Sequence, residues 1–342
     1  MSSHTIILDQ LDGREAAALL EDGQLADLIV ADETVPPVGT IYRATIDRPV
    51  KGQGGSFLKI PDGTAFLRQA KGLRPGEPLL VQVSGRAEQG KAVPVTSKLL
   101  FKGRYAIVTP DAPGLNISRA IRDEARRDAL LELAHDMMGG RPMGLILRSS
   151  CEEENDDEAI AEDITAMADV AEKITNEREG APETLLDGDG PHAFAWREWS
   201  MPATVIARAG AFETEGVLDL IDGLRTPRVA LGRDGAMWIE PTRALIAVDV
   251  NAGSDTSPAA ALKVNLAAAR DLPRQLRLRG LGGQVTLDLA PMAKKDRKLF
   301  ESTLRAAFRA DRIETALVGW TPLGHFELQR KRERMPLAEI LT

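Results

Sequence analysis

Two nearly continuous apolar runs that each end near an aspartate constrain the fold of this chain more than any other feature. The run ALIAVDV (residues 244–250) contains Asp249, and the run QVTLDL (284–289) contains Asp288. Runs of this length and composition are typical of buried β-strands. Between them, Pro258 begins a predicted helix, which glycines end shortly before the second run. The sequence therefore predicts a strand, a helix and a second strand in this order.

The strand–helix–strand pattern brings the two aspartates together. The crossover is expected to be right-handed and the strands parallel, so that their carboxyl ends meet at one edge about 4.8 Å apart. Two carboxylates this close raise each other's pKa unless a cation lies between them, and Mg²⁺ prefers oxygen ligands. We therefore expect Asp249 and Asp288 to hold magnesium, with Asn251 orienting a metal-bound water or a phosphate from the same strand face. Helix caps and buried ion pairs are alternative explanations for such aspartates.

The distribution of charge favours a polyanionic ligand, although the net charge is −8. Residues 38–100 contain ten lysines and arginines against four acids, and residues 270–342 contain fifteen against nine. Residues 151–190, by contrast, hold fifteen acids and two bases. Two basic regions separated from one acidic segment indicate a phosphate-binding surface. The alternative is that these charges only keep the surface solvated.

The rest of the composition excludes several classes of protein. Cys151 is the single cysteine and the four histidines show no metal-ligand spacing, so we expect no disulfide within the chain and no zinc. No apolar stretch is long enough for a membrane span, and the amino terminus lacks the basic-then-apolar order of a signal peptide. We therefore expect a cytoplasmic protein.

Glycine-separated, β-rich runs between residues 38 and 100 predict a small barrel. Five such runs follow one another: VGTIYRATI, GGSFLKI, TAFL, EPLLVQVSG and KAVPVTSKL. Their length and spacing are typical of an OB-fold, which presents aromatic and basic side chains to single-stranded nucleic acid. Phe57 shares a strand face with Lys59 and lies across a turn from Phe66, an arrangement suited to stacking a base. The alternative is that both phenylalanines only pack in the barrel core.

The segments on either side of this barrel predict mixed α/β structure. The first 35 residues predict a small α/β piece, in which an amphipathic stretch around Leu19 and Leu20 separates two strand-like runs. Beyond the barrel, the sequence predicts two strands with a helix between them and an acidic helix after them. Arg148 and Ser149 end the second of these strands, where their side chains could bind a phosphate group.

Several motifs resemble, in order and spacing, the nuclease core of the ribonuclease E/G family. They are IAVDVNAG, LKVNLAAARDLPRQLRLRGLGGQVTLDLAPM, LRAAFRADR and LGHFELQRKRER. Weaker similarity extends over nearly the whole chain. DGQLADLIV and GTIYRATI are similar to the family's entry into its RNA-binding barrel, and KGRYAIVTP and NISRAI resemble the start of its 5′-end sensor.

The resemblance implies a fold of several α+β and α/β subdomains. An RNase H-like platform would be interrupted by an OB-fold barrel and a 5′-sensor, and a DNase I-like catalytic subdomain would follow. The implied boundaries are residues 1–36 and 181–228 for the platform, 37–100 for the barrel, 101–180 for the sensor and 229–342 for the catalytic subdomain.

The resemblance also implies roles for single residues. Asp249 and Asp288 match the family's magnesium-binding aspartates, and Asn251 matches the asparagine beside the first of them. The residues that look like the grip on a 5′-monophosphate are Gly103, Ile107, Arg148 and Ser149. The barrel residues that look like RNA contacts are Phe57, Phe66 and Lys91. Further candidates for phosphate contacts, which could equally form a solvated face, are Arg277, Arg279, Lys294, Lys295, Arg330 and Arg332.

Three features depart from the family's pattern. Pro291 stands where the family often has another aspartate, and Pro273 lies inside the predicted helix, where we expect a bend. The sequence printed here ends at Thr342 without the family's CPxCxG zinc-link or its small domain. We therefore expect a short form that is a monomer, or a dimer not linked by zinc.

The expected activity is magnesium-dependent cleavage within single-stranded RNA, leaving 5′-phosphate and 3′-hydroxyl ends and favouring 5′-monophosphorylated substrates. Two alternatives remain open. One is a non-catalytic RNA-binding protein on a decayed nuclease scaffold, for which Pro291 is an argument. The other is an interaction platform in RNA-decay machinery.

Overall fold

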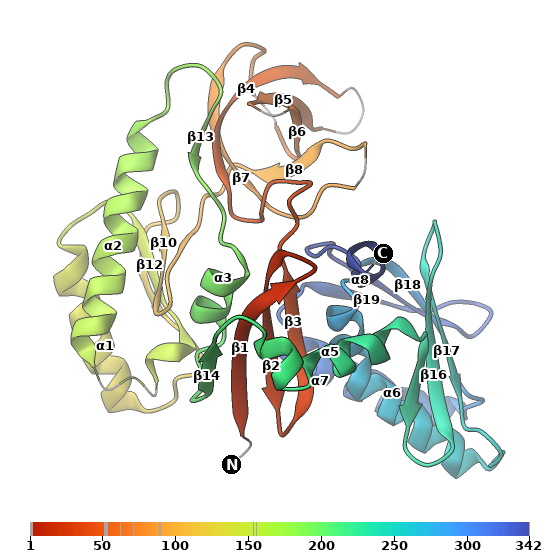
Figure 1. The fold of residues 1–342 in the computed structure, drawn as a ribbon. Coiled ribbons are helices and arrows are strands. Elements are labelled where there is room, and N and C mark those ends of the chain that lie inside the picture. Colours follow the sequence, from red (N-terminus) through yellow and green to blue (C-terminus); the bar gives the residue numbers. More distant parts are fainter. Residues whose placement is uncertain are drawn as a thin grey trace. The chain divides into compact units, whose positions relative to one another are not determined.

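The computed structural model describes residues 3–50, 54–61, 63–70, 72–88, 90–152, 154 and 156–341. The chain divides into two compact units (Figure 1). Unit 1 consists of residues 1–31 and 203–342, and unit 2 consists of residues 32–202. Within the described residues, no helix combines the length and the apolar character needed to cross a bilayer.

The first sheet of unit 1 is an antiparallel meander with one parallel strand added. Its order is β14-β1-β2-β3, and β1 pairs with β14 in parallel. Its strands are β1 (His4–Leu11), β2 (Arg14–Glu21), β3 (Gln24–Val30) and β14 (Thr204–Ala207). Two short helices and a 3₁₀ turn follow: α4 (Ala211–Thr214), α5 (Val217–Asp222) and η2 (Gly223–Arg225).

The α/β expectation for the first 35 residues is wrong, because the amphipathic stretch around Leu19 and Leu20 forms strand β2. The turns on both sides of β2 explain this outcome. Asp12 and Gly13 both have positive φ angles, as do Asp22 and Gly23, so that each Asp-Gly pair closes a two-residue hairpin. Asp-Gly between apolar runs is a strong local signal for a hairpin, and it outweighs the helix-like spacing of the leucines.

The second sheet of unit 1 has six strands in the order β15-β16-β17-β18-β20-β19. Its strands are β15 (Arg228–Leu231), β16 (Gly235–Pro241), β17 (Ile246–Asn251), β18 (Gly283–Asp288), β19 (Thr315–Trp320) and β20 (Phe326–Arg330). The helices of this region are α6 (Pro258–Leu278), η3 (Lys294–Asp296), α7 (Arg297–Ala310) and α8 (Leu337–Ile340). Apolar residues of α6 and α7 share one buried core with every second residue of the central strands.

Helix α6 connects β17 to β18 as the sequence predicts. Ser257 caps its first turn by accepting a hydrogen bond from the backbone N–H of Ala260, and Pro258 occupies the position where a missing N–H costs nothing. Pro273 lies inside the helix, which continues beyond it to Leu278.

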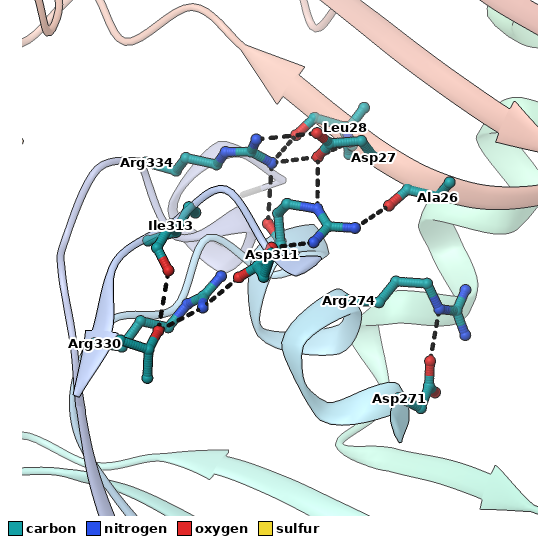
Figure 2. Close-up of polar contacts among 11 residues, drawn as sticks. Ala26, Asp27, Leu28, Asp271, Arg274, Asp311, Ile313, Arg330 and Arg334 are labelled. Carbon is teal, nitrogen blue, oxygen red and sulfur yellow. Dashed lines mark hydrogen bonds and ion pairs between the residues drawn. The ribbon is translucent and has the colours of Figure 1, made fainter. Parts of the chain in front are cut away.

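A buried ion-pair network joins the two sheets of unit 1 (Figure 2). Asp27 of β3 pairs with Arg334 at 2.5 Å and with Arg277 of α6 at 3.3 Å. Asp311 pairs with the same Arg277 and, at 2.6 Å, with Arg330 of β20. Both carboxylates are almost completely buried, so the network links the first strands of the chain to its last strand through charges that are largely shielded from water.

Unit 2 contains a closed five-stranded barrel, as the sequence predicts. The sheet order is β13-β4-β5-β6-β8-β7, and an additional β4–β7 pairing closes it, consistent with an OB-fold. Its strands are β4 (Ile41–Pro49), β5 (Ser56–Ile60), β6 (Gly63–Leu67), β7 (Pro78–Val83) and β8 (Val93–Thr96), with β13 (Glu183–Leu186) added on β4.

The rest of unit 2 is a small sheet with two long helices and a third, shorter one. The sheet order is β11-β12-β10-β9. Its strands are β9 (Phe101–Lys102), β10 (Ala106–Thr109), β11 (Leu115–Ile117) and β12 (Gly144–Leu147). The helices are α1 (Glu124–Met138), η1 (Ser149–Cys151), α2 (Asp157–Asn176) and α3 (Pro191–Glu198).

Candidate active site

The two strand-end aspartates lie opposite each other in unit 1. Strands β17 and β18 are parallel, and Asp249 is the register partner of Asp288, which confirms the predicted adjacency. Cα partners on neighbouring strands are about 4.8 Å apart. Val248, Val250 and Leu287 alternate with these aspartates and are buried, so both carboxylates project from the face of the sheet opposite its core.

The electrostatics of the pair disfavour two negative charges. The pKa of Asp249 is raised above its usual value, first by partial burial and then by the negative charges of Asp288 and Glu240. Glu240 lies on β16, opposite Ala247 of β17 and therefore two register pairs away from Asp249. A cation held between the carboxylates would relieve this repulsion.

Asn251 shares the exposed strand face with Asp249. Its side-chain oxygen accepts a hydrogen bond of 2.9 Å from the backbone N–H of Gly253. This bond fixes the orientation of the amide and directs its oxygen into the turn after β17. The side-chain nitrogen is then the group that remains to donate to a water or a phosphate oxygen.

Two further residues near the pair, Asn265 and His325, are not among the residues predicted from the sequence. Asn265 of α6 is fully buried and donates to the carbonyl of Ala290 at 2.9 Å, while it accepts from the N–H of Ala290 at 3.1 Å. These two hydrogen bonds anchor the chain just after Asp288. His325, which precedes β20, places its Nε2 3.8 Å from a carboxylate oxygen of Asp288. Asn265 could have been found as a polar residue in an apolar helix face, whereas His325 approaches Asp288 only through strand pairing.

The donor set fits a hard divalent cation with few protein ligands. Among the residues that the structure describes, no group of three or more histidine, cysteine, aspartate or glutamate side chains is placed to hold a metal ion. Magnesium commonly takes one or two carboxylates and keeps several waters, so Asp249 and Asp288 would provide a sufficient protein contribution.

The predicted RNA-contact residues of the barrel lie on its outer surface. Phe57 and Phe66 are half-buried and are not part of the buried barrel core, and their ring centroids are 5.4 Å apart. The guanidinium of Arg48 lies 5.3 Å from the Phe57 ring centroid. Lys59 is exposed and 3.8 Å from Asp47, and exposed Lys91 pairs with Glu88 at 2.7 Å. The aromatic pair therefore forms a half-exposed patch with cations nearby.

The predicted sensor residues gather around one loop of unit 2. Arg148 donates to the carbonyl of Gly103 at 2.7 Å, and Ser149 is exposed at the start of η1. Ile107 is half-buried on β10, next to β12. A Cβ on Gly103 would lie 2.2–2.5 Å from the Asp163 carboxylate, so a larger residue there would displace that carboxylate from the backbone N–H groups it accepts from.

Two arginines expected to contact RNA, Arg277 in α6 and Arg279 directly after it, are engaged within the protein. Arg277 belongs to the buried network with Asp27 and Asp311, and it also donates to the carbonyl of Ala26. Arg279 is 7% exposed and donates to the side chain of Gln275. An RNA phosphate could reach either guanidinium only by displacing these partners, and their contact with RNA stays a prediction.

Comparison with known proteins adds an independent observation. A family model described as the Ribonuclease E/G family matches residues 101–200 and 197–333. Ribonuclease E of Nostoc sp. is 28% identical over 99% of this chain and 57% of its own length, and ribonuclease E of Synechocystis sp. is 28% identical over 95% and 56%. Ribonuclease G of Escherichia coli K12 is 25% identical over 89% of this chain and 74% of its own. The chain thus spans little more than half the length of the two ribonuclease E relatives.

Proposed function

This chain belongs to the ribonuclease E/G family, and on that premise we propose that it is a magnesium-dependent endoribonuclease acting on single-stranded RNA. The observation that supports this best is the register that sets Asp249 directly opposite Asp288 on the exposed face of a sheet. Partial burial and then the negative charges of Asp288 and Glu240 raise the pKa of Asp249, and the repulsion between these charges favours a bound cation.

The proposed chemistry leaves a 5′-phosphate and a 3′-hydroxyl. Asp249 and Asp288 would hold magnesium, and Asn251 would donate to a water or a phosphate oxygen. When bound, the cation supplies Lewis-acid polarisation of the phosphodiester and a lowered pKa for a coordinated water. Phe57 and Phe66 would stack bases of the strand, with Lys91 near its phosphates. Arg148 and Ser149 would favour substrates with a 5′-monophosphate.

We also propose the subdomain boundaries given below, with one strand that crosses them: β13 lies in the second platform segment but pairs with β4 of the barrel. The five barrel strands lie within residues 37–100, and the sheet whose strand β12 ends just before Arg148 lies within the proposed sensor, 101–180. The parallel β1–β14 pairing joins residues 1–36 to 181–228, which we propose as the RNase H-like platform. The six-stranded sheet begins at the junction with the proposed DNase I-like subdomain, residues 229–342.

A cleavage assay tests the proposed activity. A 5′-monophosphorylated, AU-rich oligonucleotide is incubated with wild type, Asp249→Asn or Asp288→Asn in magnesium and in EDTA, and the ends of the products are mapped. We expect cleavage by wild type in magnesium alone and at least about a hundredfold loss in either variant. Asp222→Asn removes an exposed acid that pairs with Arg225 and serves as the control. Equal cleavage by wild type and Asp249→Asn would defeat the assigned site, and cleavage by neither would favour the non-catalytic alternative.

A further inference from the structure

The guanidinium of Arg148, which we propose as the group that binds a 5′-phosphate, already has an internal carboxylate partner. Its Nη2 donates to the Glu198 carboxylate at 2.5 Å. Its Nη1 donates to the carbonyl of Gly103 at 2.7 Å and to that of Arg197 at 3.4 Å. The side chains of Arg148 and Glu198 are only 19% and 14% exposed, so water screens this ion pair poorly.

Glu198 lies between two arginines. Its second carboxylate oxygen accepts from Nε of Arg197 at 2.8 Å. Arg197 in turn pairs with Asp189. Burial alone would raise the pKa of Glu198, but the charges of Arg148 and Arg197 and their hydrogen bonds lower it, so Glu198 is ionised at neutral pH.

The backbone donors beside Arg148 are also satisfied internally. The N–H groups of Arg104, Tyr105 and Ala106 donate to the Asp163 carboxylate at 3.2, 2.8 and 2.9 Å. An incoming phosphate would therefore meet a loop whose amides are already bonded. The partner that a phosphate can replace is therefore the Glu198 carboxylate, which is bound to Arg148.

We propose that Glu198 competes with the 5′-phosphate of RNA for Arg148 and so sets how strongly this chain distinguishes a 5′-monophosphate from a 5′-hydroxyl. The proposal rests on the proposed function, in which Arg148 binds that phosphate. It makes Glu198 a residue that determines specificity, because its carboxylate reduces the preference for a 5′-monophosphate that Arg148 provides.

The arrangement allows the partners of Arg148 to be exchanged without stranding a buried charge. A terminal phosphate carries a charge of about −1.5 to −2 at pH 7, against −1 for the carboxylate, and matches the guanidinium fork. When the phosphate takes the place of Glu198 on Arg148, the carboxylate keeps its bond to Arg197. The bond from Arg148 to the Gly103 carbonyl meanwhile holds the guanidinium in place.

A binding experiment separates this competition from catalysis. Fluorescence anisotropy gives the affinities of a 5′-monophosphorylated and a 5′-hydroxyl oligonucleotide of the same sequence, in EDTA and with the RNA verified as intact. The measured quantity is the ratio of the two affinities. For Glu198→Gln, which is isosteric and uncharged, we expect the ratio to rise about tenfold over wild type, because a charge-assisted competitor is lost. Glu198→Asp, which draws the carboxylate back, should raise the ratio by less.

Two controls make the result specific. Asp189→Asn removes the same charge from the same cluster but contacts Arg197 and not Arg148, so its ratio should stay at the wild-type value. The double variant that combines Glu198→Gln with Arg148→Ala should not show the raised affinity ratio of Glu198→Gln alone. A ratio that stays constant or falls in Glu198→Gln would overturn the proposal, as would an equal rise in Asp189→Asn. If the chain fails to cleave RNA but the binding ratio changes as expected, only the proposed catalytic function fails.

Discussion

At the scale of single residues, the carboxylate pair is a destabilising element that a bound cation would relieve. Partial burial and the charges of Asp288 and Glu240 raise the pKa of Asp249. A carboxyl group with a raised pKa contributes stability that is fully present below its value in the unfolded chain and is lost as the pH rises through its folded value. Without metal, ionised Asp249 therefore lowers stability at neutral pH.

This leads to a prediction for thermal unfolding. In EDTA at pH 7, Asp249→Asn should unfold at a temperature equal to or above that of wild type, because one charge of the repelling pair is gone. Adding magnesium should raise the unfolding temperature of wild type and have little effect on the variant, since ligand binding stabilises only a state that binds it. Calorimetry with and without magnesium measures both effects. An equal rise in wild type and variant would place the cation elsewhere.

At the scale of elements, helix α6 determines where β18 ends. Asn265 forms hydrogen bonds with both backbone groups of Ala290, two residues beyond Asp288, and so ties the sheet edge that carries the candidate site to helix α6. The same helix carries Arg277 into the buried network with Asp27. One helix therefore connects the position of the candidate site to the assembly of unit 1.

Replacing Asn265 tests this connection. Asn265→Ala leaves the N–H and the carbonyl of Ala290 without partners in a buried position, and each orphaned group costs about 1–3 kcal/mol. We expect the free energy of unfolding in urea to fall by at least that amount, with a loss of cleavage even under conditions where the variant is folded. Gln284→Ala, on the exposed face of β18, is the matched control. A variant as stable as this control would contradict the role of Asn265.

The outer face of the barrel supports a second prediction at this scale. Phe57→Leu keeps apolar volume beside Phe66 but removes the ring on which a base would stack. Stacking contributes about 1–3 kcal/mol per base, so binding of single-stranded RNA should weaken correspondingly while the barrel stays folded. Anisotropy with an unlabelled competitor gives the affinity, and circular dichroism verifies the fold. Wild-type affinity in Phe57→Leu would leave the ring pair with a packing role only.

At the scale of the whole molecule, the buried charges of unit 1 couple its two sheets. Burial alone would raise the pKa of Asp27, but Arg334 and then Arg277 lower it below the usual 3.8. A carboxyl with a lowered pKa contributes stability that is present above its unfolded value and is lost as the pH falls through its folded value. The attachment of the first sheet to the second should therefore weaken in acid.

Asp27→Asn tests this coupling at neutral pH. It leaves Arg334 and Arg277 without a charged partner on β3, and breaking a buried pair commonly costs about 3–5 kcal/mol. Asp271→Asn removes a more exposed pair with Arg274 on the same helix α6 and should cost about 1 kcal/mol or less. Urea unfolding gives the loss of unfolding free energy of each variant relative to wild type. At acid pH, where Asp27 of the wild type becomes protonated, the loss in Asp27→Asn should approach that in Asp271→Asn. Equal losses of unfolding free energy in the two variants at neutral pH would contradict the coupling of the two sheets through Asp27.

The sequence by itself determined the elements whose signal is local. The apolar runs around Asp249 and Asp288, the helix from Pro258 and the five barrel strands follow from periodicity, caps and turns, which act over a few residues. The Asp-Gly hairpins around β2 are equally local signals, and they outweigh the helix-like spacing of the leucines between them.

Only the tertiary structure decided which distant charges meet. Arg277 pairs with Asp27 rather than facing solvent, and Arg148, just after β12, pairs with Glu198 at the end of α3. No window of sequence contains both members of such a pair, because their contact depends on how strands and helices pack. Local periodicity determines which face of an element is apolar, whereas the partner of a buried charge is determined by the packing that excludes water from both groups.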